Sequence, residues 1–125
     1  MTGKFFAAAA AFVLMGTAAS ANTLEIVQSE GGNVVASAKN GLTLYTFRKD
    51  TTNTSNCYGN CATAWPPFTA SAYAKADGAL GLIKRKDGTM QWALNGKPLY
   101  FWQGDSARGD VTGDGVGGVW DAVRN

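Results

Sequence analysis

The chain has 125 residues, a formal net charge of +2 at pH 7, two cysteines and no histidine. This charge indicates no nucleic-acid partner, and the short basic run Lys84–Lys86, broken at once by Asp87, predicts a solvated strand end. The absence of histidine removes the commonest general base and the commonest transition-metal ligand, so no cofactor is expected.

The first 21 residues have the layout of a secretory signal peptide. Lys4 supplies the positive charge, Phe5 to Met15 form an apolar run, and Ala19-Ser20-Ala21 predicts cleavage after Ala21. The run is about half of the roughly 20 residues that span a bilayer, so we expect no stable membrane insertion after cleavage. We therefore expect a periplasmic or secreted protein whose mature part, residues 22–125, is a single β domain.

Short alternating segments separated by glycine-containing turns predict strands along the mature chain. The expected strands are 24–28, 34–38, 42–47, 80–86, 89–94, 97–102 and 116–123. Asn40-Gly41, Asp87-Gly88 and Asn95-Gly96 suit hairpin turns, because their central positions need positive φ. Residues 69–78 are a connector without strong periodicity, and one short helix is expected there or near the cysteines.

The chain contains two copies of one unit. Residues 40–50 (NGLTLYTFRKD) and 95–105 (NGKPLYFWQGD) share Asn, Gly, Leu, Tyr and Asp at an offset of 55 residues, that is, 95 − 40. The same offset relates Phe47 to Trp102 and Trp65 to Trp120. This periodicity indicates an internal repeat.

We take repeat one as about 24–68 and repeat two as about 79–123. Each is predicted to be a three-stranded β-meander with one apolar face, which is marginal alone. The predicted fold is therefore mainly β: a compact antiparallel domain in which two pseudo-symmetric meanders bury their apolar faces against each other.

The two cysteines, Cys57 and Cys61, are expected to pair in an oxidising compartment. Closing so short a loop contributes about 2 kcal/mol in the chain-entropy model, so the disulfide fixes a local segment. A redox role is less favoured, because neither a C-x-x-C motif nor a βαβ setting is evident.

Both copies satisfy the pattern Y-x-[FWY]-x-x-D, as Tyr45-Thr-Phe47-Arg-Lys-Asp50 and Tyr100-Phe-Trp102-Gln-Gly-Asp105. Together with the segments CYGNCATAWPP and GDVTGDGVGGVW, they make the chain similar to the bacterial secreted-repeat family of unknown function, whose members are often predicted lipoproteins. The resemblance implies an exported envelope protein. Many members have a histidine after the final tryptophan, but here the position is Asp121, so a metal or haem role through that histidine does not carry over.

The motif residues have two interpretations. Residues i and i+2 of a strand share a face, so each copy places a tyrosine beside a second aromatic ring. The favoured interpretation is a core stripe, with Asp50 and Asp105 anchoring the following loops through backbone N–H groups. The alternative is a pair of ligand-binding pockets, whose candidate residues are Tyr45, Phe47, Asp50, Tyr100, Trp102 and Asp105.

The glycine-rich stretch 105–118 carries Asp105, Asp110 and Asp114, a weak candidate for a Ca²⁺ site. Its spacing does not fit an EF-hand, and aspartates and glycines equally mark plain turns. No catalytic residues are assigned, because nothing in the chain can activate a serine or threonine in the way histidine does.

These observations favour an exported non-enzymatic module that binds an unknown small ligand or an envelope protein. A structural or stress-protective envelope component without a small ligand is the second hypothesis. An Asp-based hydrolase using Asp50 and Asp105 is the third.

Overall fold

The computed structural model describes residues 23–125, so the predicted signal peptide lies outside the described residues. The regular elements are short and, with two exceptions, are strands. They are β1 (Leu24–Ser29), β2 (Gly32–Ser37), β3 (Tyr45–Phe47), α2 (Asn60–Ala64), β4 (Thr69–Ala70), β5 (Leu80–Lys84), β6 (Met90–Leu94), β7 (Lys97–Pro98), the 3₁₀ helix η1 (Val116–Gly118) and β8 (Trp120–Ala122). Every strand pair is antiparallel, which confirms the predicted mainly β class.

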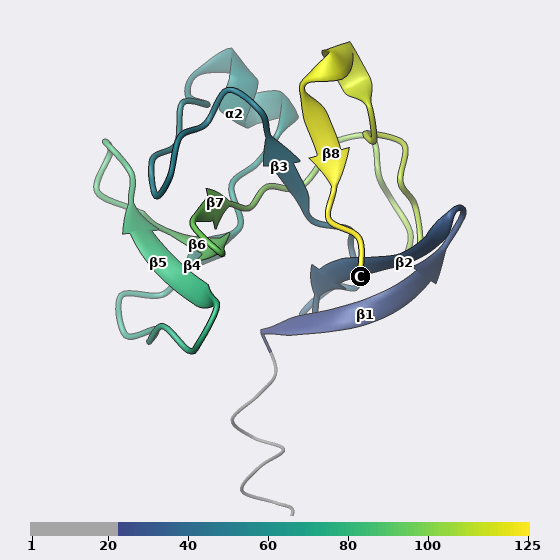
Figure 1. Ribbon diagram of the computed structural model, residues 1–125. Helices are drawn as coiled ribbons and strands as arrows, with labels where there is room; N and C mark the ends of the chain where they lie inside the picture. Colours follow the sequence, from purple (N-terminus) through teal and green to yellow (C-terminus); the bar gives the residue numbers. More distant parts are fainter. Residues whose placement is uncertain (1–22) are drawn as a thin grey trace, which may run out of the picture.

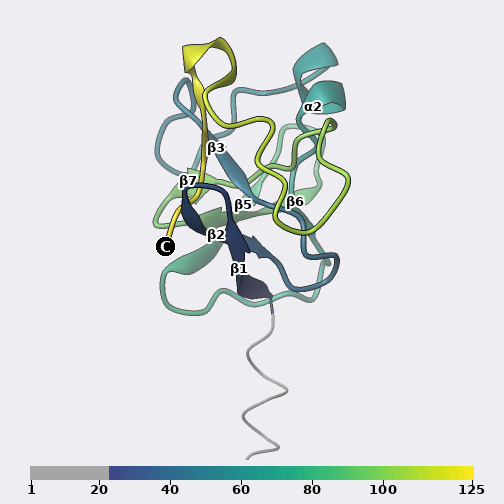
Figure 2. The ribbon, with the colours of Figure 1, turned by 90° about the vertical axis from the view of Figure 1, so that its right-hand side faces the viewer.

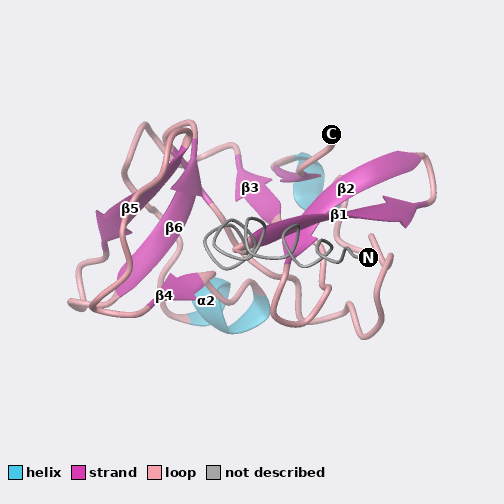
Figure 3. Cartoon of the chain, turned by 90° about the horizontal axis from the view of Figure 1, so that it is seen from below, coloured by secondary structure: helices cyan, strands magenta, loops and turns pink. Residues whose placement is uncertain are grey.

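The strands form two outer groups and one central pair. The β1–β2 hairpin lies on one side, and β4, β6, β5 and β7 form a sheet on the other (Figure 1). Between them β3 pairs with β8, so the C-terminal strand lies beside the third strand of the chain (Figures 1 and 2). Seen from below, the two outer groups are well separated, with α2 on the side of β4 (Figure 3).

One of these element predictions is corrected, and the predicted short helix and disulfide are confirmed. The expected strand 116–123 begins as the 3₁₀ helix η1, because Gly117 and Gly118 have φ of 62° and 72°, outside the extended region. The connector 69–78 contains β4 in place of a helix, and the expected short helix is α2, at the cysteines. Cys57 and Cys61 form the predicted disulfide.

The strands 42–47 and 97–102 are shorter than predicted, because each exchanges partners along its length. Thr43 bridges to Ala36 within its own repeat, whereas Tyr45 bridges to Tyr100 and to Ala122 of the other repeat. The regular hydrogen-bonded pairing of each strand is therefore short, because the partner changes within a few residues. The pairing of Tyr45 with Tyr100, equivalent residues 55 apart, marks the pseudo-two-fold axis.

In each half of the molecule, three backbone hydrogen bonds join three residues in a closed ring. Val35 N–H donates to Val123 O (2.8 Å), Val123 N–H to Leu44 O (2.9 Å), and Leu44 N–H to Val35 O (3.0 Å). Val123 comes from repeat two, whereas the other two residues come from repeat one.

The second ring repeats this plan with the repeats exchanged. Trp92 N–H donates to Phe68 O (2.9 Å), Phe68 N–H to Leu99 O (2.9 Å), and Leu99 N–H to Trp92 O (3.0 Å). Here Phe68 is the residue contributed by repeat one. The two predicted meanders are therefore interlocked: each repeat contributes its last segment to the hydrogen-bond ring of the other.

The repeats differ in the length of their second hairpin turn. Ser37 N–H bonds Leu42 O across four residues, whereas Leu94 pairs with Lys97 across two. Equivalent residues are thus 55 apart after the turn (97 − 42) but 57 apart before it (94 − 37). Val35 of the first ring accordingly corresponds to Trp92 of the second.

The basic run Lys84–Lys86 is not simply a solvated strand end. Arg85 is only 4% exposed, and its guanidinium donates to Ser55 Oγ (2.9 Å), Gln91 Oε1 (2.8 Å) and Cys57 O (2.7 Å). Its flanking lysines remain exposed. Because side chains alternate between the two faces of a strand, Arg85 points inward, where three neutral acceptors take the place of water.

Because each hydrogen-bond ring needs a strand from both repeats, neither repeat should fold alone. Fragments 22–78 and 79–125, kept apart at low micromolar concentration, are expected to lack a cooperative thermal transition by far-ultraviolet circular dichroism. Mixing them in equal amounts should restore β signal. A cooperative melt from either fragment as a monomer would contradict the interlocked arrangement.

Candidate functional site

Four aromatic rings form a continuous stack across the pseudo-two-fold axis. At its centre the rings of Trp65 and Trp120 lie 3.8 Å apart and 3° from parallel. Phe47 stacks on Trp120 at 4.2 Å, and its counterpart Trp102 lies on Trp65 at 4.2 Å. The second aromatic residue of each Y-x-[FW]-x-x-D segment therefore covers one end of the stack.

The two motif tyrosines close the sides of this stack. Tyr45 meets Trp65 edge-on at 5.2 Å, and Tyr100 meets Trp120 in the same way at 5.2 Å. Both tyrosines are completely buried. Edge-to-face and offset arrangements are the favourable geometries for aromatic pairs, so this cluster is a well-packed core.

Each motif aspartate binds the tyrosine of the other repeat. Tyr45 Oη–H donates to Asp105 Oδ2 (2.7 Å), and Tyr100 Oη–H donates to Asp50 Oδ2 (2.7 Å). The second oxygen of each carboxylate accepts a backbone N–H of the following loop, from Thr112 to Asp105 (3.0 Å) and from Asn56 to Asp50 (2.7 Å). These bonds are the loop anchors that the favoured interpretation expects.

Burial sets the protonation of these groups. It raises the pKa of both Tyr45 and Tyr100 well above the ordinary tyrosine value, and the neighbouring carboxylates act in the same direction. Both phenols are therefore protonated donors at neutral pH. Burial also raises the pKa of Asp50, against the hydrogen bonds from Tyr100 and Asn56 and the attraction of Arg85.

The second repeat extends its tyrosine–aspartate pair into a longer network. Tyr100 Oη lies 2.6 Å from Ser55 Oγ, which accepts from the buried guanidinium of Arg85. In the first repeat the corresponding phenol, Tyr45 Oη, accepts the N–H of Gly113 (3.2 Å). The half around Tyr100 therefore contains a buried cation, Arg85, whereas Tyr45 has a backbone N–H in the corresponding place.

Gly113 lies in close contact with the aromatic stack. A Cβ at this position would lie 2.8 Å from Trp102 Cγ and 2.8 Å from Trp65 Cη2. A side chain there cannot be accommodated while the two rings keep their positions. The loop therefore needs a glycine at position 113, where it crosses the aromatic stack.

The three aspartates of that loop have separate structural partners. Asp105 binds Tyr45 and Thr112, Asp110 accepts the backbone N–H groups of Ser106 and Ala107, and Asp114 accepts the N–H of Ala122. Within residues 23–125 no three histidine, cysteine, aspartate or glutamate side chains are grouped as a metal site.

The six candidate ligand-binding residues are thus gathered into one pseudo-symmetric core. Two of them, Phe47 and Asp50, also line a surface groove of about 510 Å³. This groove contains Lys97 and the ion pair between Arg48 and Asp121, whose atoms lie 2.8 Å apart. The carboxylate of Asp50 is already occupied there by the bonds described above.

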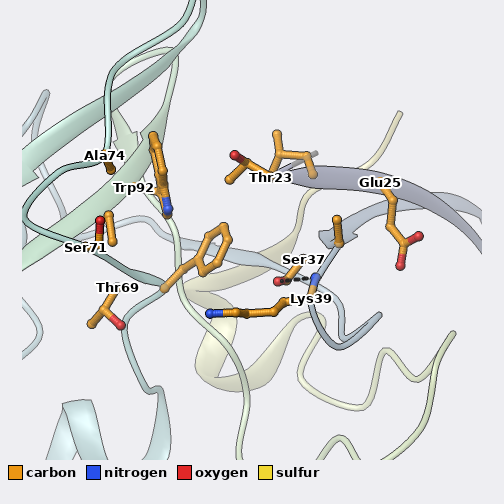
Figure 4. A pocket seen from close by; sticks show the side chains of 12 residues that line it. Thr23, Glu25, Ser37, Lys39, Thr69, Ser71, Ala74 and Trp92 are labelled. Carbon is orange, nitrogen blue, oxygen red and sulfur yellow. Dashed lines mark hydrogen bonds between the residues drawn. The ribbon is translucent and has the colours of Figure 1, made fainter. Parts of the chain in front are cut away.

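A second groove, of about 540 Å³, lies where the open end of the β1–β2 hairpin faces β4 and β6. We call it the Trp92 groove. Its apolar lining comes from Leu24, Phe68, Ala70, Ala74 and Trp92. Its polar lining comes from Thr23, Glu25, Ser37, Lys39, Thr69 and Ser71 (Figure 4).

Trp92 carries an unused hydrogen-bond donor into this groove. Trp92 is 8% exposed, and the side-chain hydrogen bonds of residues 23–125, such as those of the neighbouring Gln91, do not include its Nε1–H. Figure 4 shows the ring nitrogen turned toward the interior of the pocket. Buried indole N–H groups usually find a partner, so this one marks a place for an acceptor.

Sequence reasoning missed the Trp92 groove, because its aromatic residues lie outside the repeated motif. Trp92 corresponds to Val35, and Phe68 corresponds to Val123, through their places in the two hydrogen-bond rings. The available signal was this difference between repeats: large aromatic rings in one half stand where the other half has valine.

The arrangement can be compared with known proteins. A family model described as a secreted repeat of unknown function matches residues 25–69 and 81–124. The chain belongs to this secreted-repeat family. The two matches correspond to the two interlocked units, and the identification made from the motif is confirmed.

No curated protein and no solved structure has significant similarity to this family member. Within the described part of the chain, no helix is long and apolar enough to span a membrane.

Gly113→Ala should destabilise the fold by about 1–3 kcal/mol, because the added methyl group overpacks the aromatic stack. The matched control is Gly81→Ala, whose nearest neighbour would be Ala93 O at 4.0 Å and which should change stability little. Urea denaturation gives both values. Near-ultraviolet circular dichroism should also weaken in Gly113→Ala alone; an unchanged spectrum and stability would contradict the packing described here.

Asp105→Ala should lower stability by about 1–3 kcal/mol, because the buried Tyr45 Oη–H loses its acceptor, and the exposed Thr112 N–H adds little to this cost. Asp105→Asn keeps an acceptor oxygen and should cost less. Asp77→Ala, at an exposed position, is the control. If both Asp105 variants melt like the parent, the carboxylate is not an anchor and the ligand-site interpretation gains.

Proposed function

We propose that this chain is an exported, non-enzymatic binding module whose ligand occupies the Trp92 groove. The observation that carries the proposal is the indole N–H of Trp92, which has no acceptor within residues 23–125 and faces an open groove. A ligand acceptor can take the place that solvent has beside this donor. The groove volume of about 540 Å³ is within the usual range for small-molecule sites.

The motif residues favour a ligand site elsewhere, because their polar groups already take part in hydrogen bonds within the chain. Tyr45 and Tyr100 are fully buried, and both carboxylate oxygens of Asp50 and of Asp105 accept hydrogen bonds from the chain. A catalytic acid or nucleophile needs an oxygen that substrate can reach. The motif therefore favours a scaffold role, and an Asp-based hydrolase has no support in its geometry.

The segment beside the groove adds a second feature typical of binding surfaces. Tyr73 is 91% exposed, and its neighbours Ser71 and Ala74 both line the groove. An exposed tyrosine in the segment that lines a groove offers apolar contact and a hydroxyl at low entropic cost.

The proposal is tested by native mass spectrometry of the protein purified from the periplasm and incubated with the small-molecule extract of the same cells. The parent should carry a bound small molecule. Ala74→Trp should lose it, because the added ring fills the groove from its lining. Ala72→Trp, an exposed neighbour outside the groove, should retain it.

Three outcomes count against the proposal. A bound molecule that survives in Ala74→Trp places the site elsewhere, and loss in Phe47→Ala alone would return it to the motif. If parent and variants all show only the mass of the protein, the structural hypothesis without a small ligand is preferred.

A further inference from the structure

The charge in the Trp92 groove is unbalanced. Glu25 lines the groove, but both of its carboxylate oxygens accept from Arg108, at 2.8 and 3.0 Å. Figure 4 shows this carboxylate turned away from the side of the pocket on which Trp92 stands. Lys39 also lines the groove, and among residues 23–125 its ammonium has no carboxylate within 4.0 Å. Among the described residues that line the groove, Lys39 therefore carries the one charge that is free to meet a ligand.

Two donors of different kinds thus enter the same pocket. Trp92 Nε1–H has no acceptor in the described chain, and Lys39 carries three N–H donors and the unpaired charge. Neither group can accept a hydrogen bond, so together they select an acceptor that carries negative charge.

The rest of the lining is apolar over one side. Leu24, Phe68, Ala70 and Ala74 offer carbon surface next to these donors. A ligand that fills the groove must therefore combine an apolar body with an anionic end. A phosphate monoester fits less well, because its charge of about −1.5 to −2 at pH 7 would face a single lysine in this groove.

We propose that the occupant is a small carboxylic acid with an apolar body. Its carboxylate accepts the indole N–H of Trp92 and faces the ammonium of Lys39, and its body lies against Phe68 and Leu24. This assignment rests on the proposed function, since it names the ligand class for the same groove.

The test uses three probes that share one body and differ in the head: phenylbutyrate, phenylbutanol and phenylbutylamine. Each is titrated into the ¹⁵N-labelled exported protein, and the indole N–H resonances are followed by NMR. Loss of one cross-peak in Trp92→Phe assigns the Trp92 signal. Phenylbutyrate should bind most tightly and should move this signal furthest downfield, phenylbutanol should bind more weakly, and phenylbutylamine should bind least.

Charge variants locate the anionic end. Lys39→Gln should weaken phenylbutyrate about three- to fivefold, the size expected for an exposed ion pair, and should leave phenylbutanol unchanged. Lys97→Gln, an exposed lysine of the other groove, should affect neither probe. Trp92→Phe keeps an aromatic ring and should weaken phenylbutyrate and phenylbutanol alike, about three- to tenfold.

The results separate the two proposals. If the three probes bind equally well, or if Lys39→Gln has no effect, the carboxylate assignment is wrong and the groove remains a site for neutral apolar molecules. If phenylbutyrate binding depends on Lys97, the assignment belongs to the wrong groove. If no probe moves the Trp92 signal while mass spectrometry finds a molecule lost in Ala74→Trp, only the ligand class fails; if both experiments are negative, the groove is not a binding site.

Discussion

The stacked pair of Trp65 and Trp120 constrains almost everything else in this molecule. Their rings lie 3.8 Å apart across the pseudo-two-fold axis, so the two repeats must approach each other closely along their aromatic faces. Phe47 and Trp102 can then cover the ends of the stack, and the loop that passes over it must place Gly113, without a side chain, against the rings. Face-to-face burial of this kind favours one relative placement of the repeats, because aromatic packing is directional.

The exchange of strands between the repeats follows from the same close approach of their aromatic faces. Each repeat contributes a last strand to the hydrogen-bond ring of the other, and each motif aspartate accepts from the other repeat's tyrosine. The pattern Y-x-[FW]-x-x-D therefore describes an internal contact between two units: the tyrosine lies beside the stack, the second ring covers its end, and the carboxylate ties the following loop to the partner unit. The motif is thus explained by the packing of the two units.

Function is better sought where the repeats differ. Trp92 is the pseudo-symmetric counterpart of Val35, and it lines the Trp92 groove. Gln91 corresponds to Val34, and it helps to hold the buried guanidinium of Arg85. These differences break the symmetry of the core, because they place a polar and an aromatic group in one half where the other half has valine.

The sequence by itself determined the repeat, the antiparallel strands with their Asn-Gly turns, the disulfide of Cys57 with Cys61, and the family. These features depend on local patterning: alternation, turn chemistry and a fixed offset are all readable along the chain. Only the tertiary structure decided which strands pair across the repeats, that Arg85 is buried, and that Trp92 faces a groove. A period of two shows that a strand has two faces, but it does not specify the partner on either face, because those neighbours come from segments distant in the chain.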